Sequence, residues 1–329
     1  MMVIADHPIT AKAHTNIALV KYWGKLDNQL IIPQNDSLSL TLDEFYTQTT
    51  VQFLPELSAD EVIFDNERLS ESASKRVRTF LDHVRQLAGI NFHARVITKN
   101  FVPTAAGLAS SASGFAALAG AASRAAGLNL NRRDLSRLAR RGSGSATRSI
   151  FGGFAAWQQG QDDATSYAYP IDEQPTWDIA VVALVLNAKQ KKISSRVGMR
   201  LAVETSPFYS AWIKASQADF ETVKTAIQNE DFELLGHTSE QNAMRMHALT
   251  LSSDPNFTYF NADSIQAMNM VKELRLQGIS CYFTMDAGPN VKIICQGADA
   301  ERIRCYFQSS FGQDQVLVTR SGTGISISN

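Results

Sequence analysis

Between a strand-like stretch and a helix-like stretch, the chain reads Pro103-Thr104-Ala105-Ala106-Gly107-Leu108-Ala109-Ser110-Ser111. The preceding residues 92–97 alternate in a way that predicts a strand, and the alanine-rich residues that follow predict a helix to about Ala126, with Gly127 as its stop. A strand, a small-residue loop and a helix in this order allow the backbone to approach a ligand closely, because the loop has few bulky side chains.

This loop is a candidate phosphate site. Free N–H groups and the positive end of the helix dipole favour an anion at the start of a helix. The pattern GxxxxGK[ST] does not occur in the chain, so the loop is not of the Walker type. On composition alone, a phosphate site and a plain strand-to-helix turn without a ligand are equally good interpretations.

Outward from the loop, helices and strands are expected over most of the chain. In the first half we expect strands over 38–42, 49–53, 92–97 and 179–186, helices over 71–88, 111–126 and 132–141, and a surface loop over 158–176. In the second half we expect helices that start near 206, 231, 262 and 299, and strands over 280–285, 291–295 and 316–319. The pattern predicts an α+β fold. A length of 329 residues predicts two domains, 1–186 and 187–329.

Composition narrows the functional classes. Hydrophobic residues make up 44% and charged residues 19%, which is typical of a folded globular protein. Lys and Arg number 31 against 32 Asp and Glu, and this balance argues against nucleic acid as a partner. The apolar run 179–186 is too short to cross a membrane, and the first ten residues lack a signal-peptide core. We therefore expect a soluble, cytoplasmic protein with no membrane partner.

The three cysteines point the same way. Cys281, Cys295 and Cys305 are odd in number and form no CxxC pair, which predicts reduced thiols and neither a disulfide framework nor a structural zinc. Their apolar neighbours predict that all three are small core residues.

Three further segments collect groups suited to anions or to proton transfer. They are Ser143-Gly144-Ser145-Ala146-Thr147-Arg148, the run Lys21-Tyr22-Trp23-Gly24-Lys25 near Asn16, and Asp286 before Gly288. Arginine pairs with two oxygens at once, and a carboxylate at a strand end is a reasonable general base. Each has an ordinary alternative, namely a helix-to-helix loop, a basic turn with buried aromatics and a turn-forming aspartate, and taken alone each alternative is favoured.

Arg76 is a candidate on geometric grounds. In the predicted helix 71–88, the apolar stripe centres near Val84 and Ala88. Arg76 then lies roughly 80° from that centre and Arg78 roughly 110° on the other side. We expect Arg76 to point toward the domain interior and Arg78 to be more exposed, although a solvated arginine remains the ordinary alternative for both.

Together and in this order, the segments resemble the mevalonate diphosphate decarboxylases, a family within the superfamily of galactokinase, homoserine kinase, mevalonate kinase and phosphomevalonate kinase. The matching segments are 14–18, 21–25, 103–112, 141–149, 151–153, 194–199 and 285–290. The resemblance covers nearly the whole chain. Kinases of the superfamily usually carry Gly where this chain has Ala109, and Thr147 is a local variation.

The resemblance implies an N-terminal domain of the ribosomal protein S5 domain 2-like type and a ferredoxin-like C-terminal domain, with the active site between them. It implies ATP-dependent decarboxylation of mevalonate 5-diphosphate to isopentenyl diphosphate, a requirement for ATP and Mg²⁺, and a homodimer. A kinase or a monophosphate decarboxylase of the same superfamily is the nearest alternative. A catalytically inactive binding module is a second one, which the intact loop and Asp286 disfavour.

The resemblance also implies roles for residues. Asp286 is the base that takes the proton of the tertiary hydroxyl, and Arg148 orients the substrate carboxylate. The substrate is held by Asn16, Tyr22, Trp23, Gly24, Lys25, Arg76, Ser143, Gly144, Ser145, Ala146, Thr147, Arg148, Ser195 and Arg196. The ATP phosphates lie on Ala105, Ala106, Gly107, Leu108, Ala109, Ser110 and Ser111. Ser110 or Ser111 reaches the metal, and one of Lys189, Lys191 and Lys192 reaches the phosphates.

Overall fold

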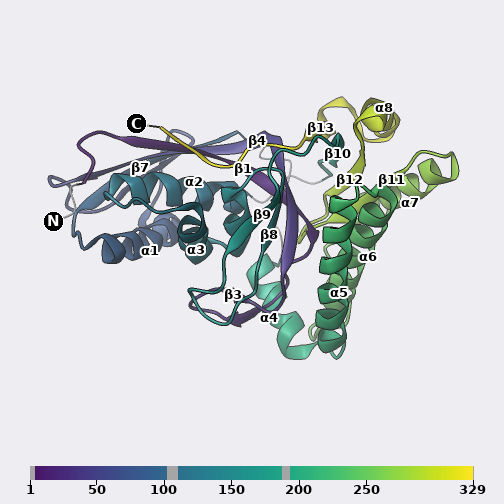
Figure 1. The fold of residues 1–329 in the computed structure, drawn as a ribbon, viewed down its shortest axis with the longest axis horizontal. Helices are drawn as coiled ribbons and strands as arrows, with labels where there is room; N and C mark the ends of the chain where they lie inside the picture. The colour runs from purple at the N-terminus through teal and green to yellow at the C-terminus, as the bar shows by residue number, and fades with distance from the viewer. Residues whose placement is uncertain (1–3, 102–109, 187–192, 329) are drawn as a thin grey trace.

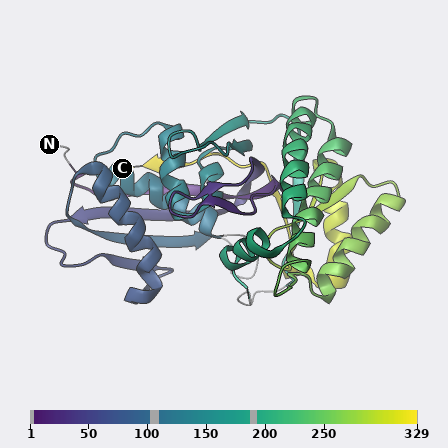
Figure 2. The same ribbon diagram turned by 90° about the horizontal axis from the view of Figure 1, so that it is seen from below.

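The chain folds into two α+β halves that lie side by side. The computed structural model describes residues 4–101, 110–186 and 193–328. One half carries the long sheet with α1, α2 and α3, and the other carries the helices α4 to α8 around a smaller sheet (Figures 1 and 2). The predicted two-domain α+β class is thus confirmed. Among the described residues, no helix combines the length and the apolar character needed to cross a membrane.

The first sheet is built around two long antiparallel strands, β1 (Ile9–Val20) and β4 (Ser37–Leu54). Its order is β14-β1-β4-β7-β5-β6, and β8 and β9 continue from the first part of β4. The other strands are β5 (Glu61–Phe64), β6 (Glu67–Arg68), β7 (His93–Phe101), β8 (Phe154–Trp157), β9 (Ala168–Asp172) and β14 (Ser326–Ser328). The short strands expected over 38–42 and 49–53 are two parts of β4. A separate ribbon pairs β2 (Lys25–Asp27) with β3 (Ile32–Pro33).

Within the residues that the structure describes, three helices accompany this sheet, and all three were predicted. They are α1 (Glu71–Ala88), α2 (Ser110–Ala125) and α3 (Arg132–Gly142). The Ser70 side chain caps the start of α1, and Gly89 ends it in the left-handed conformation. Asn131 caps α3, as its position in the sequence predicts.

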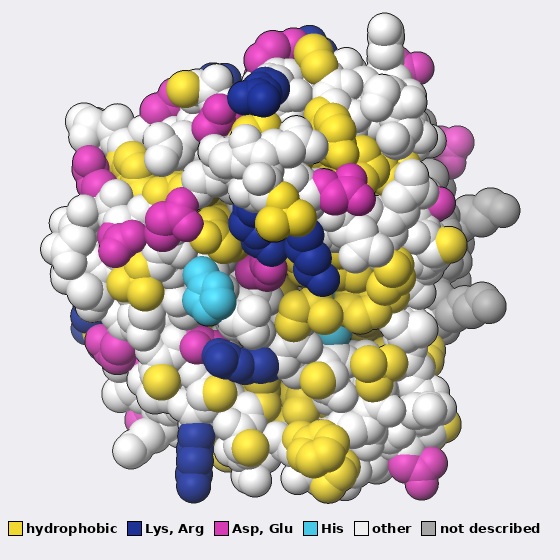
Figure 3. All heavy atoms as spheres, turned by 90° about the vertical axis from the view of Figure 1, so that its right-hand side faces the viewer, with side chains coloured by type: hydrophobic (Ala, Val, Ile, Leu, Met, Phe, Trp, Pro, Cys, Tyr) yellow, Lys and Arg dark blue, Asp and Glu magenta, His cyan; other side chains and the backbone are white. Residues whose placement is uncertain are grey.

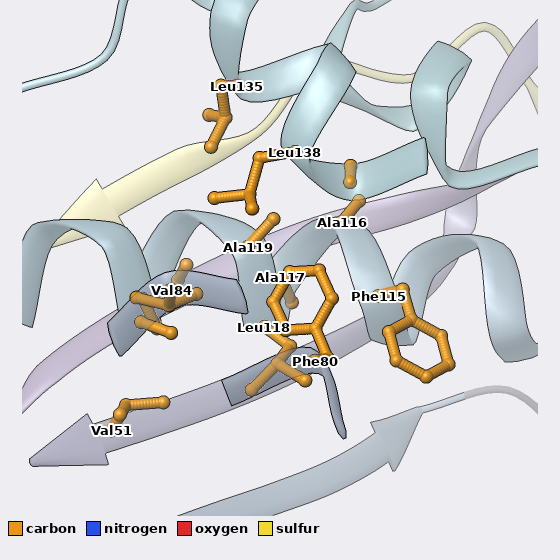
Figure 4. Close-up of a cluster of buried hydrophobic side chains, with 14 of the residues drawn as sticks. Val51, Phe80, Val84, Phe115, Ala116, Ala117, Leu118, Ala119, Leu135 and Leu138 are labelled. Carbon is orange, nitrogen blue, oxygen red and sulfur yellow. The ribbon is translucent and has the colours of Figure 1, made fainter. Parts of the chain in front are cut away.

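The alanines of α2 allow that helix to lie directly on the sheet. Ala116, Ala117 and Ala119 are fully buried, and they pack with side chains of α1, α3 and β4 (Figure 4). At Gly120 a Cβ atom would come within 3.2 Å of the Ala11 Cβ. The small residues therefore bring α2, and the loop before it, close to β1.

The second sheet has the antiparallel order β11-β12-β10-β13. Its strands are β10 (Ile179–Leu184), β11 (Cys281–Met285), β12 (Val291–Gln296) and β13 (Val316–Arg320). The helices described in this half are α4 (Ser195–Thr205), α5 (Tyr209–Gln228), α6 (Phe232–Leu251), α7 (Ala262–Leu276) and α8 (Ala300–Phe311). On the outer face of this half, acidic and basic side chains are interspersed among apolar ones (Figure 3).

The two halves share a hydrophobic core. One buried cluster joins Leu38 and Leu40 of β4 with Val223 of α5, Leu235 of α6 and Ile294 of β12. Because residues of both sheets pack in the same cluster, the ends of β1 and of β11 are held at a fixed distance.

Several details of the structure differ from the sequence-based expectations. The strand β10, which lies before the predicted domain boundary, pairs with β12 and β13 of the second sheet. The predicted loop 158–176 contains β9, and the helix α4 was not predicted. Cys281 and Cys295 are buried as expected, whereas Cys305 is exposed because it lies on the outer side of α8.

Candidate active site

Asp286 lies at the point where strands of the two sheets end near one another. It directly follows β11, and Lys21 directly follows β1. The Lys21 Nζ donates to Asp286 Oδ1 at 2.9 Å, and the Lys292 Nζ lies 3.3 Å from Asp286 Oδ2. Both lysine side chains are 2% exposed, while the Asp286 side chain is 31% exposed. The carboxylate is therefore held from two sides and open to a ligand on another.

The two lysines set the charge of this centre. Burial alone would raise the pKa of Asp286, but the ammonium groups of Lys21 and Lys292 outweigh it and hold that pKa well below its usual range. Burial lowers the pKa of Lys21, and the Asp286 carboxylate opposes that shift. The centre thus contains an ionised carboxylate at every pH at which the protein is expected to work.

Arg148 is a second fixed charge beside this centre. It belongs to a short 3-10 helix, Gly144–Ile150, and is fully buried. Its Nη1 donates to Ser37 Oγ at 2.5 Å and its Nη2 to Asn16 Oδ1 at 3.3 Å. Asn16 in turn donates to the Ser145 carbonyl oxygen at 3.1 Å. Burial lowers the pKa of Arg148 to about 10, and Asp286 opposes the shift, so the guanidinium stays charged at neutral pH.

Tyr22 lies between this arginine and the outer cations. Its ring meets Trp157 edge to face with centroids 4.8 Å apart. Burial raises the pKa of Tyr22, and the charges of Arg148 and Arg196 act against the shift. The phenol therefore remains a neutral hydrogen-bond donor, which suits an anionic ligand.

Three cations gather around a hollow of about 280 Å³ between β2 and α4. Lys25, Arg196 and Arg200 line it, together with Glu204. Burial, and then the charges of Arg196 and Arg76, lower the pKa of Lys25. Arg196 lies close enough to act on both Lys25 and Arg76, and cations this close repel one another, so an anion bound among them would relieve the repulsion.

Arg76 reaches this region, although it is more exposed than Arg78, which reverses the expected order of the two. It is exposed, but its guanidinium lies over the Phe115 ring and donates to the Gly142 carbonyl oxygen at 3.1 Å. Arg78, expected to be the more exposed of the two, is half-buried because it donates to the Asp60 carbonyl oxygen and pairs with Glu71.

Three hydroxyl groups meet at the start of α2. Ser143 donates to Ser111 at 3.4 Å, and the hydroxyls of Ser143 and Ser145 lie 3.2 Å apart. The structure describes Ser110 only as the first residue of α2. The predicted ATP-loop residues 105–109 and the candidates Lys189, Lys191 and Lys192 lie outside the described residues.

Most of the remaining predicted residues are buried or hold the backbone of the site in place. Trp23 is buried against Tyr259, and Ala146 and Thr147 are fully buried. At Gly24 the φ of 118° and a Tyr209 hydroxyl 1.9 Å from any added Cβ require glycine. Half-buried Ser195 begins α4, directly before Arg196.

Two residues of the centre were not among the predicted site residues. The sequence marks Lys21 only as one cation of the 21–25 segment, and it does not mark Lys292 as a site residue. A signal was present, since Lys292 interrupts the apolar run Val291–Cys295 in a predicted buried strand. A lysine at such a position requires a partner, because an isolated buried charge is costly.

The fold and this geometry define a class, that of two-domain α+β proteins with a fixed Lys–Asp–Lys centre beside a basic hollow suited to a phosphorylated ligand. Comparison with known proteins narrows the class. A family model described as the diphosphomevalonate decarboxylase-like N-terminal domain matches residues 13–168. Another, the mevalonate 5-diphosphate decarboxylase C-terminal domain, matches residues 181–325. The chain belongs to the diphosphomevalonate decarboxylase family.

Individual relatives agree over most of the chain. A diphosphomevalonate decarboxylase of Ganoderma lucidum is 37% identical over 308 residues, 86% of this chain and 77% of that protein. The solved structure of the mevalonate diphosphate decarboxylase from Enterococcus faecalis is 48% identical, covers 98% of this chain and 99% of that one, and has a TM-score of 0.93. A complex of MDDEF with MVAPP, AMPPCP and magnesium is 48% identical with the same coverage and a TM-score of 0.94.

Proposed function

We propose that the protein is an ATP-dependent decarboxylase that converts mevalonate 5-diphosphate to isopentenyl diphosphate, with release of ADP, phosphate and CO₂. The observation that carries the proposal is the Asp286 carboxylate held between Lys21 and Lys292, next to the fixed guanidinium of Arg148. The family relationship and the ligands of the similar complex support the choice of substrates.

Asp286 accepts the proton of the tertiary hydroxyl. A carboxylate whose pKa is held low is a weak base, so it cannot remove this proton ahead of phosphoryl transfer. The proton moves to Asp286 as the hydroxyl oxygen forms its bond to the γ-phosphorus of ATP and the bond to ADP breaks. The two lysines keep the carboxylate ionised and ready until that moment.

Arg148 holds the substrate carboxylate. Two of its five N–H donors are engaged by Ser37 and Asn16 among the described residues, which leaves donors for a paired contact with a carboxylate. When the bond between the tertiary carbon and the transferred phosphate breaks, the electrons of the carbon–carboxylate bond form the double bond and CO₂ leaves. Arg148 keeps that carboxylate aligned for the elimination.

The outer cations hold the diphosphate end. Lys25, Arg196 and Arg76 supply charge, and Tyr22 with Ser143 and Ser145 supplies neutral hydrogen-bond donors. At Gly144, an added Cβ atom would lie 2.8 Å from the Tyr22 ring. Because glycine has no side chain, these donors can stay close together.

The described residues also fit a magnesium-bound nucleotide. The Ser111 hydroxyl lies at the N-terminus of a 16-residue helix, where phosphate oxygens are favoured, and 3.4 Å from the hydroxyl of Ser143. Within the described part of the chain, no group of three or more acidic, histidine or cysteine side chains could hold a metal alone. This agrees with Mg²⁺ held largely by phosphates and water, with Ser110 or Ser111 as the protein ligand. When bound, Mg²⁺ offsets the phosphate charge.

We further propose that the protein forms a homodimer, which the family resemblance implies. The cysteine pattern supports a cytoplasmic location, and the balanced charge supports the absence of a nucleic-acid partner. Light scattering during size-exclusion chromatography tests the dimer, with the mass of one chain, 36.1 kDa, as the contradicting result.

The test is CO₂ release from carboxyl-labelled mevalonate 5-diphosphate, with and without ATP and Mg²⁺. We expect release that depends on ATP and is matched by ADP. ADP without CO₂ would place the protein among the kinases of the superfamily, and neither product would favour a binding module. Asp286→Asn is the matched control, because it keeps the side-chain shape and removes the base.

A further inference from the structure

The backbone of Lys21 leaves the sheet at the point where its side chain enters the active site. The last pair of β1 with β4 is Val20 with Leu38, so the peptide groups of Lys21 lie beyond the ladder. Lys21 is 2% exposed, and water cannot serve these groups freely. Buried N–H and C=O groups need partners, and the partners decide where this residue is held.

Two buried asparagines provide them. The Lys21 N–H donates to Asn242 Oδ1 at 2.8 Å, and Asn35 Nδ2 donates to the Lys21 carbonyl oxygen at 2.8 Å. Asn242 lies on α6 of the second half, whereas Asn35 lies just before β4 of the first. The Lys21 backbone is therefore hydrogen-bonded to both halves of the molecule.

A second layer fixes the two amides. Ser216 Oγ on α5 accepts from Asn35 at 3.0 Å and from Asn242 at 3.4 Å. Asn242 Nδ2 also donates to Asp219 Oδ2 at 2.9 Å, and Arg245 pairs with the same carboxylate at 2.6 Å. Because the Asp219 carboxylate can only accept, the Nδ2 of Asn242 faces Asp219 and its Oδ1 faces the Lys21 N–H.

The side chain of Lys21 is fixed at its other end. Its Nζ donates to the Ala18 carbonyl oxygen at 2.7 Å and to Asp286 at 2.9 Å. Backbone and ammonium are thus both held, and a shift of the Lys21 peptide would move the ammonium away from Asp286. Small displacements of this kind are costly in active sites.

We propose that Asn242 and Asn35 are positioning residues, which fix the Lys21 backbone so that its ammonium holds the Asp286 carboxylate in place toward the substrate hydroxyl. This inference rests on the proposed function. A purely structural role, in which the network only joins α5 and α6 to the first sheet, is the alternative. It predicts lost stability without a specific effect on Lys21.

A double-mutant cycle separates the two roles. The kcat and KM for ATP-dependent CO₂ release are measured for wild type, Asn242→Ala, Lys21→Met and the double variant, with thermal unfolding of each. We expect Asn242→Ala to lower kcat about tenfold and to change KM less than about threefold. In the Lys21→Met background the same change costs less than about twofold, since the group it positions is gone. Ser239→Ala, equally buried on α6, is the control and keeps wild-type kcat.

The outcomes are distinct. If wild type releases no CO₂, the proposed function fails before any variant is compared. If wild type is active, a wild-type kcat for folded Asn242→Ala, or the same loss in both backgrounds, overturns the positioning role. Asn35→Ala repeats the cycle from the carbonyl side should Asn242→Ala not fold. If neither variant folds, the network is a folding element and the proposal is rejected.

Discussion

The active-site region contains two groups of cations that differ in what lies between them. Lys21 and Lys292 enclose a carboxylate, and both are almost fully buried. Lys25 and Arg196 line an open hollow, where burial and then the nearby cations lower the pKa of Lys25. Each lysine of the first group pairs with Asp286 without any ligand, whereas the repulsion that acts on Lys25 would be relieved by a bound anion. The inner group therefore suits the chemical step, and the outer group suits binding.

The largest expected effect is the loss of the inner carboxylate. Asp286→Ala should lower kcat about 10³-fold, because the tertiary hydroxyl loses its proton acceptor. Substrate KM should change less than about threefold, and circular dichroism should match wild type. Asp263→Ala, an exposed aspartate on α7 of the same half, is the control. Near-normal turnover of folded Asp286→Ala would show that the base has been assigned wrongly.

A smaller loss is expected from the arginine between the two groups. Arg148→Lys keeps the positive charge but loses the planar fork, so we expect kcat to fall about 100-fold. Single-turnover CO₂ release measures the step directly. Unchanged release would mean that charge alone, and not the paired geometry with Ser37 and Asn16, orients the carboxylate.

The outer group should affect binding more than rate. Arg196→Gln is expected to raise the KM for mevalonate 5-diphosphate about tenfold and to change kcat less than about threefold, since the contact exists before and during the reaction. The effect should shrink with added salt. Arg78→Gln, whose guanidinium is engaged by Asp60 and Glu71, should leave KM unchanged. A loss in kcat alone for Arg196→Gln would contradict the division of roles.

The smallest effect is one of pH. Burial and neighbouring cations lower the pKa of Lys25, so its charge is lost as pH rises through a value below the usual one for lysine. In the free protein, kcat/KM should therefore fall on the alkaline side. Lys25→Arg should move that fall to higher pH, because arginine keeps its proton. A profile that is identical in both proteins would exclude Lys25 as the titrating group.

The sequence predicted much of the local structure. The helix α1 and its glycine stop, the Asn131 cap of α3, and the strands on either side of Asp286 all lie where periodicity and end signals place them. These features depend on neighbours along the chain. The sheet that β10 joins cannot be predicted from such neighbours, because an apolar strand fits the core of either half equally well.

The composition of the site was harder to predict. Lys21 and Asp286 are 265 positions apart, and only the shared core brings the ends of their strands together. The family resemblance pointed to Asp286 and Arg148 but not to Lys292. The role of Lys292 becomes visible only when its burial beside Asp286 is known. A local sequence pattern can indicate which side chains are able to bind anions. Which of these cations instead pair with a carboxylate of the protein depends on the fold.

The division between the two groups is tested most directly by measuring two quantities side by side in Asp286→Asn and Arg196→Gln. These are the Kd of mevalonate 5-diphosphate by calorimetry, and the single-turnover rate of CO₂ release at saturating substrates. We predict a near-normal Kd with a lost rate for Asp286→Asn, and a weakened Kd with a near-normal rate for Arg196→Gln. The opposite pattern, or equal losses in both quantities for both variants, would contradict the separation of chemistry from binding.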